Sequence, residues 1–239
     1  MRIYIIVSIL FCFCSCSYND VKQDQWQRGA FPTEISGYTP QAANSPILMH
    51  KATEAQDPWQ LRQSQDGIPI YTRKVAGSPI LEYKANVIID APISKAIALF
   101  EDEKQISRWY YQCAHSELVK NENPNNKIIY LILHMPWPVS PRDFVFRRAR
   151  TDDHEKGMIS YTLIALPDML PEVKGVIRVR TIESIWRFKS LSPGQTELFF
   201  QQHTDPAGSI PYSIVNQLAV QTPYNSLKNF RKLITGKDA

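Results

Sequence analysis

The order of apolar patterns along the chain limits the fold more than any other feature of this sequence. Strand patterns at Ile68–Val75 and Ile80–Ile89 precede helical spacing over Ile93–Phe100 and a second short helix over Glu103–Trp109. Strands and helices that are segregated along the chain predict an antiparallel sheet with its helices on one side, an α+β architecture. Six further strand patterns follow, separated by turn sequences: Ala114–Lys120, Lys127–Met135, Arg142–Arg150, Met158–Leu166, Val176–Lys189 and Thr196–Thr204.

The last patterned segment, Ile210–Ile234, predicts one long amphipathic helix. Its apolar residues recur at helical spacing, and Pro223 is expected to kink it. A strongly curved antiparallel sheet that wraps around such a helix encloses a cavity. We therefore predict a helix-grip fold that encloses a largely preformed hydrophobic tunnel.

Residues 1–16 differ from the rest of the chain. Arg2 is followed by an apolar run, Ile3–Phe13, that is too short to cross a bilayer and favours a secretory signal peptide. After the run, Ser15 precedes Cys16, which resembles the lipobox of bacterial lipoproteins and implies lipidation of Cys16. The alternative is an ordinary signal peptide with incidental cysteines. Residues 17–56 are polar and aperiodic, so we predict a tether there and one folded domain over residues 57–236.

Composition and motifs narrow the classes of function. The formal net charge of +4 is too small to indicate a nucleic-acid partner. After residue 16 the sequence contains a single cysteine, Cys113, so an internal disulfide is excluded there. We predict no catalytic residue, no metal and no cofactor, since nucleophile and nucleotide motifs are missing from the sequence. The chain is expected to be monomeric. Four histidines lie on different elements without metal-ligand spacing: His115, His134, His154 and His203.

Three stretches carry a family resemblance. Residues 135–145, Met-Pro-Trp-Pro-Val-Ser-Pro-Arg-Asp-Phe-Val, are similar to the Pro-aromatic-Pro and Arg-Asp-aromatic signature of START lipid-transfer domains. Residues 175–179, Gly-Val-Ile-Arg-Val, and residues 205–211, Asp-Pro-Ala-Gly-Ser-Ile-Pro, with Asn216 resemble the phosphatidylcholine-transfer branch of that family. The resemblance covers about residues 57–235 and implies binding of a hydrophobic ligand without catalysis. Arg142 and Asp143 are interpreted as structural, available for a fixed ion pair.

Strand alternation and the resemblance together select candidate ligand-binding residues. On the strand from Arg142, Phe144, Phe146 and Arg148 share one face, which the resemblance places inward. An inward Arg148 requires a carboxylate, a ligand anion or water as partner; the alternative is a solvent-exposed position at the strand end. The complete predicted set is Trp109, Leu131, Phe144, Phe146, Arg148, Arg180, Ile182, Gln201, His203 and Leu218.

The predicted ligand is a lipid, but its class stays open. In the phosphatidylcholine branch an aromatic cage surrounds choline, whereas Leu131 and Ile182 stand here where aromatics are expected, and the candidate for the phosphate-binding arginine, Arg108, is shifted in register. The expected ligand is therefore a phospholipid, a sterol-like lipid, a fatty acid or an isoprenoid. We expect an exported protein, anchored in the membrane, that holds this ligand for transfer or sensing at the bacterial cell envelope. The alternatives are a cyclase-like or hydrolase-like helix-grip enzyme and an envelope interaction module without transfer.

Overall fold

The computed structural model describes residues 57–237. The predicted signal peptide, the lipidation site Cys16 and the tether lie outside these residues. The elements, in chain order, are β1 (Gln60–Gln65), β2 (Ile68–Val75), β3 (Ser78–Ile89), α2 (Ile93–Glu101), the 3-10 helix η1 (Glu103–Gln105), α3 (Ile106–Trp109), β4 (Cys113–Asn123), β5 (Asn126–Leu133), β6 (Arg142–Asp153), β7 (Met158–Ala165), β8 (Ile177–Arg178), β9 (Thr181–Ser192), β10 (Gln195–Asp205) and α4 (Tyr212–Thr235).

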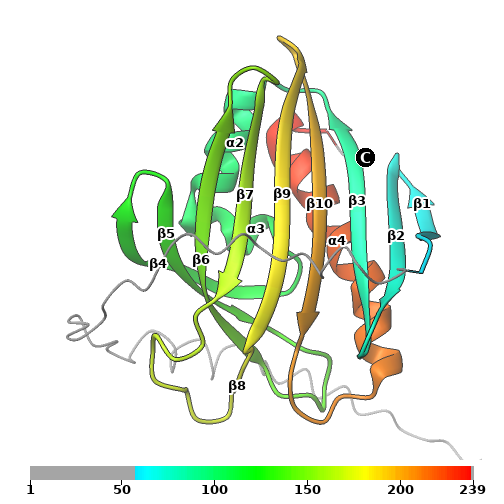
Figure 1. The fold of residues 1–239 in the computed structure, drawn as a ribbon, viewed down its shortest axis with the longest axis vertical. Helices are drawn as coiled ribbons and strands as arrows, with labels where there is room; N and C mark the ends of the chain where they lie inside the picture. The colour runs from blue at the N-terminus through cyan, green and yellow to red at the C-terminus, as the bar shows by residue number, and fades with distance from the viewer. Residues whose placement is uncertain (1–56, 238–239) are drawn as a thin grey trace, which may run out of the picture. The chain divides into compact units, whose positions relative to one another are not determined.

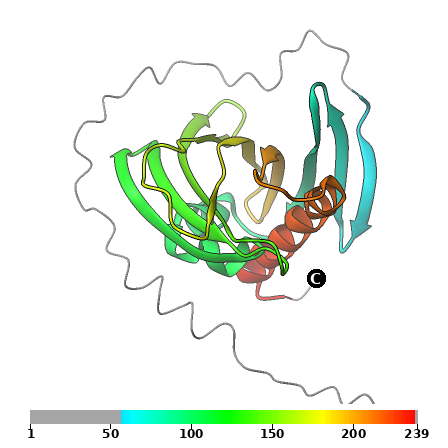
Figure 2. The ribbon, with the colours of Figure 1, turned by 90° about the horizontal axis from the view of Figure 1, so that it is seen from below.

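All ten strands belong to one curved sheet with the order β1-β2-β3-β10-β9-β7-β6-β5-β4. The strands pair antiparallel, except that the short β8 pairs in parallel with β6. The helices lie together on the concave side, and α4 runs along the opening of the sheet (Figures 1 and 2). It packs on β2 and β3 and touches α2 and α3. The predicted α+β helix-grip fold is confirmed.

Strand β1 was not predicted by the sequence pattern. Its residues are almost all exposed, because it is an edge strand and lacks the alternation of a strand with one buried face. The hairpin to β2 turns at Asp66 and Gly67, whose φ angles of 54° and 67° suit the tight turn of a two-residue hairpin. The turn is tied to α4, because Asp66 accepts hydrogen bonds from Tyr224 (2.6 Å) and Lys228 (2.8 Å).

Helix α4 is a single helix of 24 residues. It continues through the buried Pro223, the position at which the kink was predicted. At its N-terminal end Asn216 fastens the helix to β3, accepting a hydrogen bond from the backbone N–H of Leu81 at 3.0 Å. Within residues 57–237, no helix is long and apolar enough to cross a membrane.

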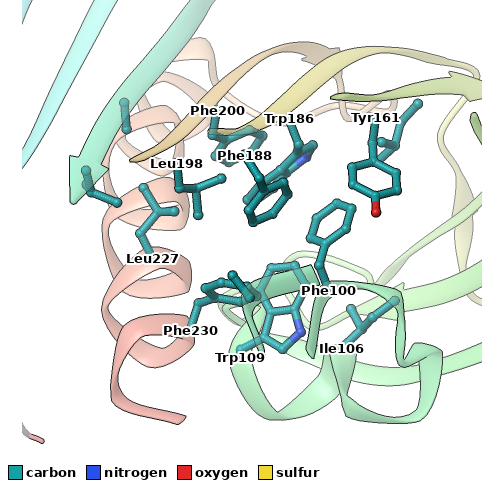
Figure 3. Close-up of a cluster of buried hydrophobic side chains, with 14 of the residues drawn as sticks. Phe100, Ile106, Trp109, Tyr161, Trp186, Phe188, Leu198, Phe200, Leu227 and Phe230 are labelled. Atoms are coloured by element: carbon teal, nitrogen blue, oxygen red, sulfur yellow. The ribbon is translucent and has the colours of Figure 1, made fainter. Parts of the chain in front are cut away.

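An aromatic cluster joins the helices to the sheet (Figure 3). Phe100 of α2 lies 5.1 Å from Trp186 of β9, and Trp109 of α3 lies 5.1 Å from Phe230 of α4, measured between ring centroids. Trp186 stacks on Phe200 of β10 at 3.6 Å. Such ring pairs contribute about 0.5–1.5 kcal/mol each beyond the area they bury. The cluster therefore holds α2, α3 and α4 at fixed positions over β9 and β10.

Candidate ligand cavity

Two adjoining pockets lie between the concave face of the sheet and the helices. The first is bounded by β5, β6, β7, β9, β10, α2 and α3, and its lining is apolar apart from a few polar groups. Its residues are Phe100, Ile106, Trp109, Tyr110, Ile129, Leu131, Leu133, Phe144, Phe146, Arg148, Leu163, Ile182, Trp186 and Gln202.

The second pocket lies toward the start of α4 and the loop between β5 and β6. Its lining includes Tyr83, Met135, Arg142, Thr204 and Leu218. Four residues line both pockets and separate them: Tyr110, Leu133, Phe144 and Gln202.

The pockets are narrow in this structure. The volume open to the centre of a water molecule is about 40 Å³ in the first pocket and about 90 Å³ in the second. Each volume holds a few water molecules, because one requires roughly 10–15 Å³ on this measure. The cavity is therefore smaller than the predicted preformed tunnel, and an acyl chain requires its walls to move apart.

Most of the predicted ligand-binding residues lie around this cavity. The alternation predicted for β6 is correct: Phe144, Phe146 and Arg148 face inward, while Asp143, Val145 and Arg147 face the other side. Leu218 lines the second pocket. The predicted residues in the wall of the first pocket are Trp109, Leu131, Phe144, Phe146, Arg148 and Ile182.

Arg148 is buried and paired. Its guanidinium donates to the Glu103 carboxylate at 2.5 Å and to the backbone oxygens of Phe100 (2.9 Å) and Glu101 (3.4 Å). Those two oxygens belong to the last turn of α2, where carbonyl groups have no partner within the helix. A cation there also interacts favourably with the helix dipole. Arg148 thus closes the C-terminal end of α2, and its partner is a carboxylate of the protein.

The placement of Arg180 in the cavity was wrong. Arg180 is 55% exposed and pairs with Asp168 (3.1 Å) and Glu172 (2.6 Å) on the surface. The prediction treated residues 176–189 as one strand, but β8 ends at Arg178 and β9 begins at Thr181. The break interrupts the alternation, so the inward set begins only at Ile182.

The placements of Gln201 and His203 were also wrong. Gln201 is buried on the other face of the sheet, where it donates to Glu82 at 2.5 Å, and His203 lies 3.2 Å from the Ser78 hydroxyl. Gln202 and Thr204 line the cavity instead. A signal in the sequence could have found them, because they share strand parity with Leu198 and Phe200, which are fully buried.

Other side chains weighed from the sequence lie away from the pockets. Arg108, the candidate phosphate ligand, is exposed and donates to Gln105 at 2.9 Å. His134 is exposed as well. Among residues 57–237, the pocket linings contain no carboxylate and no imidazole, and no group of side chains there is suited to hold a metal ion.

Tyr110 is a cavity residue that the sequence reasoning missed. Burial raises the pKa of its hydroxyl to about 12, and polar interactions with Gln202 and Tyr83 offset part of that rise. Burial also raises the pKa of Tyr83 well above its usual range. Both phenols are therefore neutral at physiological pH and act as hydrogen-bonding groups at the junction of the pockets.

The three stretches that resemble the family meet at one end of the cavity. Arg142 and Asp143 were interpreted as available for a fixed ion pair, but they do not pair with each other. The two residues face opposite sides of β6. Arg142 instead donates to the backbone oxygens of Ser140, Pro206 (3.0 Å) and Ala207 (2.8 Å). Asp143 pairs with Arg178. Arg142 therefore joins the β5–β6 loop to the segment before α4.

Gly208 is required where these stretches cross. Its φ of +72° is unfavourable for other residues, and an added Cβ would lie 2.9 Å from Ile177 Cδ1 and 3.0 Å from Arg142 Nη2. A Cβ at this position would require the ends of both side chains to move, in addition to the unfavourable φ.

Comparison with known proteins identifies relatives of this chain in sequence and in fold. The family model described as START domain matches residues 41–235. A STAR-related lipid transfer protein from Xanthomonas axonopodis is 32% identical, with a TM-score of 0.69 over 74% of this chain and 99% of that one. Human StAR-related lipid transfer protein 5 shares the fold at 18% identity, with a TM-score of 0.67 over 74% of this chain and 86% of that one.

Two curated proteins extend the comparison. An uncharacterized protein of Pseudomonas aeruginosa is 36% identical over 143 residues, which are 60% of this chain and 70% of that protein. Human phosphatidylcholine transfer protein is 27% identical over 119 residues, which are 48% of this chain and 56% of that protein. The chain thus matches little more than half the length of the phosphatidylcholine transfer protein.

Proposed function

Because this chain belongs to the START domain family, we propose that it binds one lipid molecule reversibly in the cavity between the sheet and the helices. The observation that carries this proposal is the apolar lining of the first pocket, built from side chains of five strands and two helices. Burial of an acyl chain there contributes about 0.8 kcal/mol per CH₂ group, so binding requires no covalent step.

The proposed route to the cavity passes between the β5–β6 loop and the start of α4. Met135 and Val139 of the loop pack with Ile80, Ile210 and Val215 in a small apolar cluster separate from the main core. A small cluster opens at lower cost than the aromatic core, because less apolar surface is uncovered. Movement of this loop away from α4 would widen the second pocket first and then the first.

Trp137 occupies the tip of the same loop and is 87% exposed. An exposed indole suits the interface between bilayer and water, where its ring meets the acyl boundary and its N–H remains solvated. We propose that Trp137 touches the membrane when lipid is exchanged.

The place of action that we propose is the bacterial cell envelope. Support comes from the sequence of residues 1–16, with its apolar run and Cys16, and from the polar segment that follows. A flexible segment of some forty residues has a root-mean-square reach of roughly 35 Å. An anchor of this kind favours short-range exchange or sensing over diffusion between compartments.

A loading experiment tests lipid binding. The purified full chain is stripped of lipid, offered lipid extract or vesicles, and examined by native mass spectrometry. We expect one lipid molecule per chain. Leu131→Trp, which fills the first pocket, should reduce loading strongly, and Leu118→Trp on the exposed side of β4 is the matched control.

Overpacking destabilises a core by about 1–3 kcal/mol, so both variants are first shown to be folded by circular dichroism. Equal loading of the two folded variants would exclude the first pocket as the binding site. Absence of any bound lipid in the unmodified chain would refute the proposed function.

A further inference from the structure

We propose that the lipid bound in this cavity carries a neutral, oxygen-bearing polar group that hydrogen-bonds to a cluster formed by Tyr110, Ser184, Gln202 and Thr204, the central polar patch. This inference rests on the proposed lipid binding and goes further, since it assigns the chemical class of the ligand and the place of its polar group.

The central polar patch is built by strand register. Gln202 of β10 lies opposite Ser184 of β9, and Thr204 follows two residues later on the same face as Gln202. Tyr110 and Gln202 line both pockets, so the patch lies where the pockets meet. Beyond it, the first pocket extends into apolar side chains.

Two hydroxyl groups of the patch have no hydrogen-bond partner. Ser184 is 1% exposed, and both its Oγ and the Oγ1 of Thr204 are buried without a partner. Strand alternation points Ser184 to the cavity, because Ile182 and Trp186 on the same face line the first pocket. Trp109, in the wall of that pocket, has an indole N–H that is likewise buried and unpartnered.

Such orphaned groups are uncommon in folded proteins, because a buried polar atom without a partner is destabilising. Here Trp109 and Thr204 line the pockets, and Ser184 lies between the lining residues Ile182 and Trp186 on the same face of β9. A ligand that brings an oxygen atom to them removes the deficit, whereas a plain hydrocarbon does not. An indole N–H can only donate, and a hydroxyl can donate or accept, so a hydroxyl or carbonyl oxygen satisfies them.

The charges around the cavity favour a neutral group over an ionised one. Within the described residues, the charged side chains that line the pockets are Arg148 and Arg142. Arg148 pairs with Glu103, a carboxylate that it shares with Lys127, and also donates to carbonyls of α2. Arg142 is held by three backbone carbonyls of the loops. A buried phosphate or carboxylate requires N–H groups of a cation aimed at it, whereas both terminal nitrogens of each guanidinium already donate to oxygen atoms of the protein.

Four ligands with the same sixteen-carbon chain separate the possibilities: hexadecanol, palmitate, palmitoyl lysophosphatidylcholine and hexadecane. Their affinities for the stripped full chain are measured by competition in native mass spectrometry. We expect hexadecanol to bind most tightly. Tighter binding of palmitate or of lysophosphatidylcholine would overturn the inference while supporting lipid binding. Failure of all four ligands to bind would overturn the inference, and the loading experiment with lipid extract would then decide the proposed function separately.

Ser184→Ala tests the contact itself. Loss of one hydrogen bond should weaken hexadecanol binding about 2- to 10-fold and leave hexadecane binding unchanged. The same substitution should raise the melting temperature of the ligand-free protein, because it removes a buried unsatisfied hydroxyl. A higher melting temperature together with weaker hexadecanol binding would distinguish a ligand contact from a structural role.

Ser190→Ala, at an exposed position of the same strand, is the matched control and should change neither quantity. Thr204→Val, which replaces the second orphaned hydroxyl by a methyl group of similar size, is the independent variant. Equal weakening of hexadecanol and hexadecane in both patch variants would mean that the residues only shape the cavity, and would overturn the inference.

Discussion

Arg178 and Asp143 form a two-point ion pair in which each side chain is 1% exposed. Arg178 Nε and Nη2 each lie 2.9 Å from a carboxylate oxygen of Asp143, and the guanidinium also donates to backbone oxygens of Leu170 (2.9 Å) and Pro171 (3.0 Å). The pair links β6 to β8, and the backbone contacts tie both strands to the segment between β7 and β8.

Arg178→Ala should lower the free energy of unfolding by about 3–5 kcal/mol, because it leaves the Asp143 carboxylate buried without its partner. Arg180→Ala is the matched control: it lies two residues away and is also ion-paired, but on the exposed surface, so its unfolding midpoint should hardly change. Urea unfolding followed by circular dichroism measures both. Similar losses in the two variants would contradict the structural role of the buried pair.

Gly208→Ala should destabilise the protein more than Gly157→Ala. Both glycines have positive φ angles, so each alanine costs about 1–2 kcal/mol in backbone strain. At Gly208 the new Cβ also meets Ile177 and Arg142, which adds about 1–3 kcal/mol, whereas nothing lies within 4 Å at Gly157. Thermal unfolding of the two variants isolates the steric effect. Equal decreases in melting temperature would show that the segment around Gly208 moves enough to accommodate the added Cβ.

Trp137→Ala should slow lipid exchange with vesicles without lowering stability. The side chain is exposed, so its loss uncovers no core, but the loop then lacks its indole for the bilayer interface. A fluorescent lipid transferred from donor to acceptor vesicles gives the rate. Leu191→Ala, which removes an exposed side chain in the β9–β10 hairpin, is the control. Unchanged exchange by the Trp137 variant would remove the loop from the proposed route.

Cys113 should make the protein less stable at alkaline pH. Burial raises the pKa of its thiol from 9.0 to about 12. A folded-state pKa above the unfolded value means that the contribution to stability is complete below about pH 9 and is lost as pH rises toward 12. Each pKa unit corresponds to about 1.4 kcal/mol.

The measurement compares the unmodified chain with Cys113→Ala in urea unfolding between pH 8 and 11. Between pH 9 and 11 the unmodified chain should lose about 2–3 kcal/mol more than the variant. Buried tyrosines contribute equally to both proteins, so the difference isolates the thiol. Parallel pH profiles would show that Cys113 ionises as readily in the folded state as in the unfolded state.

The sequence by itself determined the fold class and the inward face of β6. Phe144, Phe146 and Arg148 alternate with residues of the opposite face along an unbroken strand, and the pleat of a strand is a local property of the backbone. The long amphipathic helix after a series of strands likewise predicted a sheet closed by α4. The resemblance carried by residues 135–145 also pointed to the family, because that signature is a contiguous stretch of sequence and can be identified without the structure.

Only the tertiary structure decided the chemistry of the cavity. Arg178 pairs with Asp143, which is distant in sequence, and the break between β8 and β9 that follows Arg178 leaves Arg180 at the surface. Arg148 faces inward as predicted, but its ion-pair partner is Glu103. This residue lies on the 3-10 helix η1, which comes close to Arg148 only in the folded chain. The orphaned hydroxyl of Ser184 is a property of its surroundings, and strand alternation carries no information about which polar groups lack a partner.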